Sequence, residues 1–309
     1  MNYLITGSSG LIGTALTERL SAAGHTVTRL VRGTAPAIPL AGVVEVAWDP
    51  ARVTVDRDAL EKGGPFDGVV HLAGAGIGDR RWSPARKELI LDSRTRSTAL
   101  LVETLADLAT PPAVLVSASA VGYYGIRGDE ELTEESAGGS GFLAEVCRAW
   151  EAAAQPAADA GIRTVLLRTG IVLSTGGGVL GRQLPLFRYG LGGRMGPGTQ
   201  YRSWITLHDE VGAVLHCLGD DGVSGPVNAT APAPATDADL ARAIGTVLHR
   251  PTVLAVPSGA LRLALGREMA DQLVLGGQRV LPAALSARGF TFAHPDLDGA
   301  VRSVLAPGG

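Results

Sequence analysis

The sequence predicts an α/β protein built on a doubly wound parallel sheet, with a smaller C-terminal substrate lobe. Apolar runs alternate with helical patterns through about the first 170 of the 309 residues. These runs are almost continuously apolar, as expected for strands that are buried on both faces of a parallel sheet. Such sheets bind ligands at the carboxyl ends of their strands, so the segments just after each strand are the ones to search for a site.

The first predicted β-α-β unit carries a glycine-rich turn. An apolar run at 2–5 leads into Thr6-Gly7-Ser8-Ser9-Gly10-Leu11-Ile12-Gly13, which precedes a helical pattern and a second apolar run at 26–31. In such a turn, one glycine permits the corner, the next lets a phosphate approach the backbone, and the last lets the helix pack closely. Free N–H groups at the helix start favour a pyrophosphate. The alternative is an ordinary strand-to-helix turn, which the flanking strands disfavour.

The end of the second predicted strand indicates which dinucleotide is bound. An NAD-selective site places an acidic residue there for the ribose 2′-hydroxyl. Here the strand runs into Arg32 and Gly33 without an acid. An arginine can bind a 2′-phosphate through paired hydrogen bonds. We therefore predict Arg32 as a 2′-phosphate contact and NADP(H) as the cofactor; the alternative is a solvated arginine in a loop.

Composition argues against several classes of function. The formal net charge is −3 and there is no basic stripe, which argues against nucleic-acid binding. No apolar run approaches a membrane span, and the first strand begins too early to leave room for a signal peptide. Cys147 and Cys217 are isolated, and the histidines lack metal-ligand spacing. We expect a cytoplasmic protein with free thiols, no metal, no membrane partner and a small-molecule substrate.

The remaining elements are predicted in chain order. Further strands are expected at 43–49, 68–74, 113–117 and 164–168, with helices at 86–108 and 142–160. Beyond residue 168 we expect glycine-rich loops at 174–181 and 190–198, a short strand from Trp204, a helix capped at His208 or Asp209, a strand at 225–230, and a helix at 237–248 capped by Thr236 or Asp237. The rest is expected to be helical, ending in an amphipathic segment at 297–305. We place a dinucleotide-binding domain at 1–170 and a substrate lobe at 171–309, with some later segments returning to the sheet.

Several motifs resemble the extended short-chain dehydrogenase/reductase (SDR) superfamily over essentially the whole chain. They are the glycine-rich turn, His71-Leu-Ala-Gly74, Ser117-Ala-Ser119 with Tyr124-Gly125, Leu167-Arg168-Thr-Gly170, and Trp204-Ile-Thr-Leu-His-Asp209. Segments 48–50, 117–125 and 142–151 are similar to an atypical epimerase-like subgroup, and residues from about 250 resemble that subgroup's own C-terminal domain. The resemblance implies a Rossmann-type domain.

The resemblance also implies a set of cofactor contacts. The glycine-rich turn would hold the pyrophosphate, Asp49 would lie by the adenine, and Ser117 and Ser119 would lie near the nicotinamide. Residues 72–74 would back the adenosine ribose. The full set is Thr6, Gly7, Ser8, Ser9, Gly10, Leu11, Ile12, Gly13, Arg32, Asp49, Leu72, Ala73, Gly74, Ser117 and Arg168. Relatives of the fold often pair through the helices expected at 86–108 and 142–160, which leaves a homodimer open.

The superfamily's catalytic pair is absent. Its members place a lysine four residues after a tyrosine, which lowers the phenol pKa for proton exchange with substrate. The two lysines of this chain do not follow a tyrosine at that spacing. An alignment on Glu151 puts Leu143 and Cys147 at the two positions, and an alignment on Phe142 puts Phe142 and Val146 there. This departure argues against standard epimerase, dehydratase or alcohol dehydrogenase chemistry.

Four residues remain as catalytic candidates. Ser119 can hydrogen-bond a carbonyl, Tyr123 or Tyr124 can donate a proton near the nicotinamide, and Glu145 can act as an acid or base if its pKa is raised. The alternatives are a strand-end cap for Ser119, loop packing for the tyrosines and a solvated helix face for Glu145. Basic residues expected on the substrate side suggest an anionic substrate; they are Arg168, Arg194, Arg202 and His208.

These observations support two functions of different classes. The first is an NADP(H)-dependent oxidoreductase that delivers hydride to a polarised carbonyl or imine. The second is a sensor or regulatory protein that binds the nucleotide without turnover. The missing pair favours the second function, whereas the retained Ser117-Ala-Ser119 motif favours the first. A sugar-nucleotide epimerase follows from fold analogy alone.

Overall fold

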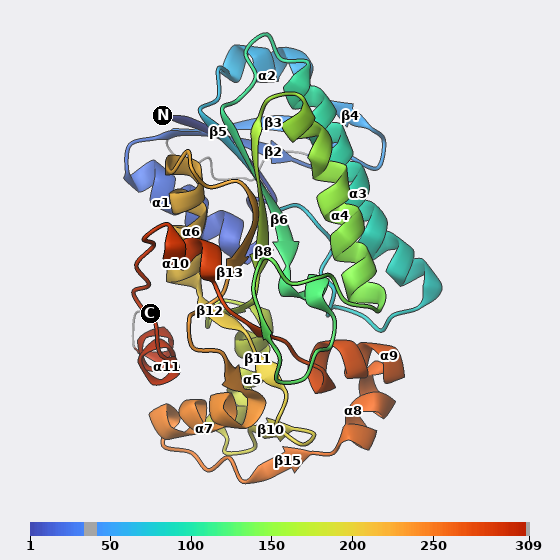
Figure 1. Ribbon diagram of the computed structural model, residues 1–309, viewed down its shortest axis with the longest axis vertical. Coiled ribbons are helices and arrows are strands. Elements are labelled where there is room, and N and C mark those ends of the chain that lie inside the picture. The colour runs from blue at the N-terminus through green and yellow to red at the C-terminus, as the bar shows by residue number, and fades with distance from the viewer. Residues whose placement is uncertain (34–41, 307–309) are drawn as a thin grey trace.

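A central, mostly parallel sheet organises the computed structural model, which describes residues 1–33 and 42–306 (Figure 1). The strand order is β13-β8-β6-β5-β1-β2-β3-β4, and β3–β4 is the antiparallel pair among the described neighbours. The strands are β1 (Asn2–Thr6), β2 (Thr26–Val31), β3 (Val43–Asp49), β4 (Thr54–Val55), β5 (Gly68–His71), β6 (Val114–Ala120), β8 (Arg163–Thr169) and β13 (Gly225–Ala229). The order reverses between β1 and β5, which makes that point the switch point of a doubly wound sheet. The predicted fold class is confirmed.

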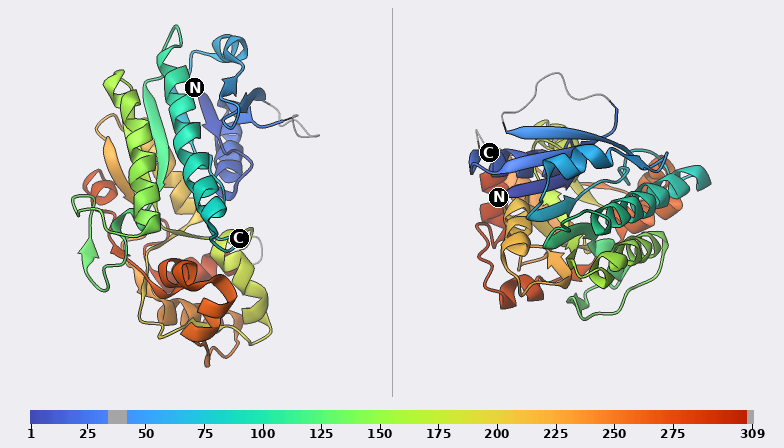
Figure 2. Two further views of the ribbon diagram at one scale, coloured as in Figure 1. Left: turned by 90° about the vertical axis from the view of Figure 1, so that its right-hand side faces the viewer. Right: turned by 90° about the horizontal axis from the view of Figure 1, so that it is seen from above.

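Helices cover both faces of this sheet (Figures 1 and 2). One face carries α1 (Leu11–Ala22), α6 (Leu207–Gly219) and α10 (Ala283–Ala287), and the other carries α2 (Arg57–Gly63), α3 (Pro84–Ala106) and α4 (Phe142–Asp159). Neighbouring residues of a strand enter opposite cores. On β1, Ile5 packs in the core that contains Leu16 of α1, whereas Leu4 packs in the core that contains Leu101 of α3.

A smaller lobe lies at the end of the sheet where β6 and β8 finish (Figure 1). Its elements and the connections to it are η1 (Val121–Tyr124), β7 (Glu131–Leu132), β9 (Ile171–Leu173), α5 (Gly178–Arg188), β10 (Gly193–Met195), β11 (Tyr201–Arg202), β12 (Trp204–Thr206), β14 (Ala235–Thr236), α7 (Asp237–Leu248), β15 (Leu254–Val256), α8 (Ser258–Leu265), α9 (Arg267–Met269), η2 (Ala270–Leu275), β16 (Arg279–Val280) and α11 (Leu297–Leu305). Leu173, Trp204, Ile244 and Val301 share its apolar core. β13, α6 and α10 follow residue 170 in the chain but belong to the sheet layers.

The C-terminal half differs in detail from the expectation. The expected loop at 174–181 starts α5, and the expected helical tail contains β15 and β16, which pair with β10 and β7. Such short strands depend on partners distant in sequence, so local patterns do not show them. The cap of α6 is Thr206, whose Oγ1 accepts from the Asp209 N–H at 3.1 Å, rather than His208 or Asp209. Thr236 caps α7 in a reciprocal capping box.

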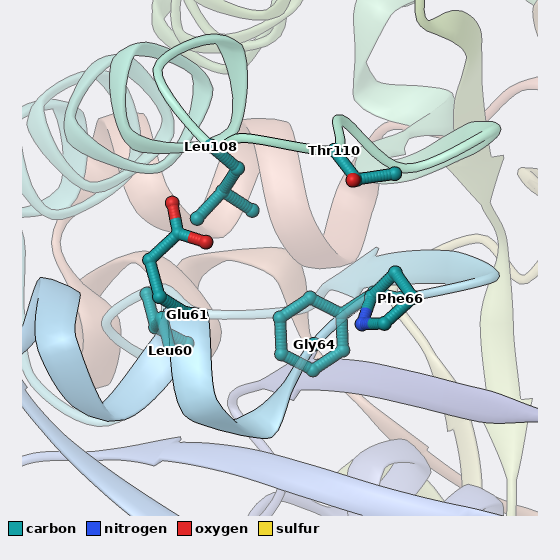
Figure 3. Close-up of a pocket in the computed structure, with 7 residues that line it drawn as sticks. Leu60, Glu61, Gly64, Phe66, Leu108 and Thr110 are labelled. Atoms are coloured by element: carbon teal, nitrogen blue, oxygen red, sulfur yellow. The ribbon is translucent and has the colours of Figure 1, made fainter.

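A small cavity at the opposite end of the sheet is not a candidate ligand site (Figure 3). It has a volume of about 110 Å³ and is lined by Leu60, Phe66 and Leu108, among others. Its residues precede β5 and β6, so it lies at the amino ends of these strands, whereas ligands of this fold bind at the carboxyl ends. None of the helices in the described ranges has the length and apolarity to cross a membrane.

Candidate functional site

The glycine-rich turn lies at the switch point, between β1 and α1. Gly7 has a φ of +67°, and a Cβ there would come within 2.6 Å of the Leu72 backbone. A Cβ at Gly13 would lie 2.4 Å from the Gly7 carbonyl oxygen, so α1 packs directly on the turn. Ser9 and Gly10 are exposed at the start of α1. The Gly10 N–H donates to the Gly7 carbonyl oxygen at 3.0 Å, whereas the Ser9 N–H has no acceptor in the described structure and is available to an anionic ligand.

A buried histidine of β5, His71, links the strand end that leads into this turn to α3. The Thr6 hydroxyl lies 2.7 Å from His71 Nδ1, and the Thr98 hydroxyl lies 2.9 Å from His71 Nε2. Burial, with a smaller effect of the nearby Arg94 charge, lowers the pKa of His71 to about 3. The imidazole is therefore neutral at physiological pH. It connects β1 to α3 as a structural element.

Two arginines near the end of β2 differ in whether the guanidinium is free to bind a ligand. Arg29 is buried; its Nε donates to Ser8 Oγ at 2.8 Å, and its Nη1 pairs with Glu45 at 3.1 Å. Arg29 therefore fixes the turn and is not available to a ligand. Arg32 is exposed just beyond β2, and within the described residues its side chain has no hydrogen-bond or ion-pair partner.

The other predicted cofactor contacts follow neighbouring strands at the same edge of the sheet. Asp49 ends β3, and its carboxylate accepts from the Ala51 N–H at 3.0 Å. Leu72, Ala73 and Gly74 come directly after β5, and the Leu72 N–H donates to the Thr6 carbonyl oxygen at 3.2 Å. The Ser117 hydroxyl is buried in β6 without a hydrogen-bond partner in the described structure, and Leu11 and Ile12 begin the first turn of α1.

A buried polar network occupies the end of β6 and β8. Ser119 Oγ donates to Glu151 Oε1 at 2.7 Å. Glu151 accepts two hydrogen bonds from Arg168, from Nε at 2.8 Å and from Nη2 at 2.9 Å. Arg168 Nη1 donates to the Tyr124 hydroxyl at 3.0 Å, and that hydroxyl donates to Asn228 Oδ1 at 2.7 Å. Charge and hydrogen-bonding needs are thus met inside the protein.

This network changes the roles expected for two residues. Tyr124 is fully buried, and burial is the main reason why its pKa is raised. Arg168 is buried as well, with its guanidinium held by Glu151 and Tyr124. Both side chains point into the network rather than into an open cleft, because they meet the acid of α4 and the amide of β13.

The two remaining catalytic candidates lie in contrasting places. Tyr123 is partly exposed, with its ring on the Arg168 guanidinium at 3.5 Å from the centroid, and the described structure gives its hydroxyl no hydrogen bond. A Cβ at Gly122 would lie 3.4 Å from Leu143 and 3.6 Å from Cys147, so these positions form the inner face of α4. Glu145 is exposed on the opposite face, because two residues turn a helix by about 200°. Glu145 is therefore a solvated acid on the outer face of α4, and this placement argues against the catalytic role expected for it.

A buried thiol stands at the position of the missing lysine. Cys147 is buried, and burial chiefly raises the pKa of its thiol to about 11. The cation that acts on this thiol is Arg94 of α3, which the sequence analysis missed. Arg94 lies over the Trp150 ring at 4.9 Å. An arginine within a long helix carries no local sign of this placement.

The basic residues expected to bind an anionic substrate do not converge. Arg202 is buried against Asp237 at 2.9 Å, and Arg194 donates to the Pro197 carbonyl oxygen at 2.7 Å. His208 lines a separate cavity of about 380 Å³ between α1, α6 and α11. With Arg168 paired to Glu151, these four residues do not form one anion site.

The loop after β5 is bound to the smaller lobe. Arg81 Nε donates to the Ala264 carbonyl oxygen at 2.7 Å, and Asp79 pairs with Arg182 of α5 at 2.6 Å. At the start of α3, Lys87 pairs with Glu268 at 2.8 Å. Residues 79–87 therefore join the sheet domain to the lobe.

Switch-point topology and a glycine-rich turn that excludes side chains define a dinucleotide-binding α/β protein. Comparison with known families agrees. Residues 3–229 match the NAD dependent epimerase/dehydratase family, and residues 256–304 match a domain of unknown function, DUF1731. The chain belongs to the NAD dependent epimerase/dehydratase family. Within it, the resemblance to the atypical extended SDR subgroup with a C-terminal domain is confirmed.

Similar proteins span nearly the full chain. An epimerase family protein of Mycobacterium bovis is 49% identical over 290 residues, 94% of this chain and 93% of that protein. The crystal structure of human epimerase family protein SDR39U1 with NADPH has a TM-score of 0.87 at 35% identity, covering 98% of this chain and 99% of that one. A nucleoside-diphosphate sugar epimerase from Corynebacterium glutamicum has a TM-score of 0.78 at 39% identity, covering 99% of this chain but 58% of that one.

Proposed function

We propose that the protein is an NADP(H)-dependent oxidoreductase of the atypical extended SDR type that acts on a small substrate. The observation that carries the proposal is Arg32, which is exposed at the end of β2 with no acidic residue beside it and no partner in the described residues. An unpaired guanidinium at this position suits a 2′-phosphate. The NADPH in the human relative's structure supports the same cofactor here.

The residues of the turn fit a dinucleotide. Gly7 and Gly13 have no room for a Cβ, so no side chain covers the backbone of the turn there. The N–H groups at the start of α1 can then bind the pyrophosphate. When bound, NADPH supplies a hydride. Among the tyrosines next to this edge, Tyr123 is partly exposed and its hydroxyl has no hydrogen bond in the described structure, so it can hold the proton for a substrate carbonyl. The Ser119 hydroxyl instead donates its hydrogen bond to Glu151.

One observation favours the alternative of a nucleotide-binding sensor without turnover. The Ser119 hydroxyl is committed to the buried Glu151 carboxylate, and Cys147 stands where one alignment places the lysine. A site that has lost both the lysine and a free serine hydroxyl retains binding more readily than proton transfer.

Calorimetric titration with NADPH, NADP⁺, NADH and NAD⁺, followed by NADPH oxidation with a panel of carbonyl compounds, separates these functions. We expect selective NADPH binding and slow turnover, with turnover lost in Tyr123→Phe while the dissociation constant for NADPH is unchanged. The exposed Tyr189→Phe is the matched control and should retain turnover. Binding without any turnover would favour the sensor, and no binding of any dinucleotide would contradict both functions.

A further inference from the structure

Arg94 of α3 holds a fixed position between the segment that follows β5 and the inner face of α4. Its Nη1 donates to the carbonyl oxygens of Ala75 at 3.0 Å and Ile90 at 3.1 Å. A Cβ at Gly74 would lie 3.2 Å from the Arg94 Cζ. The guanidinium is thus held against the segment that follows β5, at the edge of the sheet where ligands bind.

On its other side, Arg94 faces the inner surface of α4. The guanidinium lies over the Trp150 ring at 4.9 Å. Trp150 and Cys147 are three residues apart and therefore neighbours on one helix face. The positive charge of Arg94 also acts on Cys147, where it lowers the thiol pKa against the larger effect of burial. Arg94 therefore lies across from the position of the missing lysine.

The charge of Arg94 is unmatched within the described protein. Burial lowers the pKa of Arg94 to about 10, which still leaves it protonated at neutral pH. Although the side chain is half-buried, no carboxylate of the described residues pairs with it, and its Nε and Nη2 groups have no acceptor there. Because these N–H groups are not among the fully buried unpartnered atoms of the described structure, they are open to acceptors that a ligand supplies.

We propose that Arg94 replaces the absent lysine and positions the nicotinamide half of NADP(H), with its remaining N–H groups donating to the ribose hydroxyls. The cation reaches the site from α3 instead of α4, where the uncharged Cys147 stands. This assignment rests on the proposed function, because it needs a bound dinucleotide. It differs from the assignment of Arg32, which concerns the other end of the cofactor.

The first test compares Arg94→Gln with the control Arg96→Gln. Glutamine keeps an N–H donor for the Ala75 carbonyl but removes the charge, whereas Arg96 is exposed and paired with Asp92 on the same helix. We expect Arg94→Gln to weaken both NADPH and NADH by the same factor, about tenfold or more, measured by fluorescence titration. Arg96→Gln should bind as the wild type does. Arg94→Met, which keeps packing on Trp150, serves equally if Arg94→Gln does not melt cooperatively.

The second test moves the cation back to α4. In the double variant Arg94→Gln/Cys147→Lys, we expect the lysine ammonium to recover most of the lost affinity. Unchanged NADPH binding in a folded Arg94 variant, or no recovery in a folded double variant, would overturn the assignment of Arg94. Failure of the wild type to bind NADPH would instead contradict the proposed function, and the role of Arg94 would fall with it.

Discussion

At the scale of single residues, the role proposed for Arg32 predicts a preference between dinucleotides. Replacing it in Arg32→Asp removes the 2′-phosphate contact and places a carboxylate beside that phosphate. Each charge-assisted hydrogen bond contributes about 1.5–3 kcal/mol, so we expect NADPH affinity to fall about tenfold to a hundredfold while NADH affinity changes little. Calorimetry on both cofactors measures this. The exposed Arg302→Asp on α11 makes the same charge change elsewhere, and equal losses for both cofactors in Arg32→Asp would contradict the assignment.

Individual residues were predictable from sequence where their role is local. Gly7, Gly13 and Arg32 stand at fixed offsets from the first two strands, so the turn and the strand end could be found without the structure. Arg94 and Glu151 could not, because their roles depend on α3 and α4 meeting the ends of other strands. A long-range contact leaves no periodic signal in the chain.

At the scale of elements, buried strands and long helices were predictable, and short pieces were not. The predicted segment 297–305 coincides with α11, because a helix with one apolar face has a clear period. By contrast, β16 has two residues and exists through its pairing with β7. The site depends on both kinds of element. The long elements β1 and α1 flank the glycine-rich turn, and the short strands attach the smaller lobe to the sheet domain.

The packing of α6 on the sheet buries an acid, which predicts a pH dependence of stability. Glu210 is fully buried, its Oε1 accepts from Thr169 at 2.8 Å, and its Oε2 has no partner in the described structure. Burial raises the pKa of Glu210 to about 8. The folded state therefore holds a proton that the unfolded state releases above its ordinary pKa, so stability falls as pH rises toward 8 and then levels off.

The window from pH 6.5 to pH 8 isolates this effect. His71, with its lowered pKa, has the opposite slope, but this contribution is small above pH 6.5 and fades toward pH 8, because the unfolded imidazole is then mostly neutral. Across the window, urea unfolding should show a loss of about 1.5 kcal/mol in the wild type and a flatter profile in Glu210→Gln. Glu145→Gln, at an exposed acid, should retain the wild-type slope. A wild-type profile that rises or stays level would contradict burial as the cause.

At the scale of the whole molecule, the C-terminal segment is part of the sheet domain as well as of the lobe. Leu285 of α10 is fully buried in the core beneath β13 and α6, and Gln272 Oε1 accepts from the Leu143 N–H at 3.1 Å, at the start of α4. Together with the Lys87–Glu268 pair, these contacts attach the last fifty residues to both sides of the candidate site. The segment matched by DUF1731 is thus a structural component of the dinucleotide domain.

This integration predicts that one leucine of the segment controls the stability of the entire protein. Leu285→Ala leaves a cavity in the main core, so we expect a loss of about 2–5 kcal/mol in the free energy of unfolding and a single cooperative transition at lower temperature. Leu263→Ala is the matched control, because Leu263 lies in the same segment but is 80% exposed, and it should change stability by less than about 0.5 kcal/mol. Calorimetric melting with and without NADPH measures both variants. Two separate transitions in Leu285→Ala, with the second at the wild-type temperature, would mean that the segment folds apart from the sheet and that the dinucleotide site does not need it.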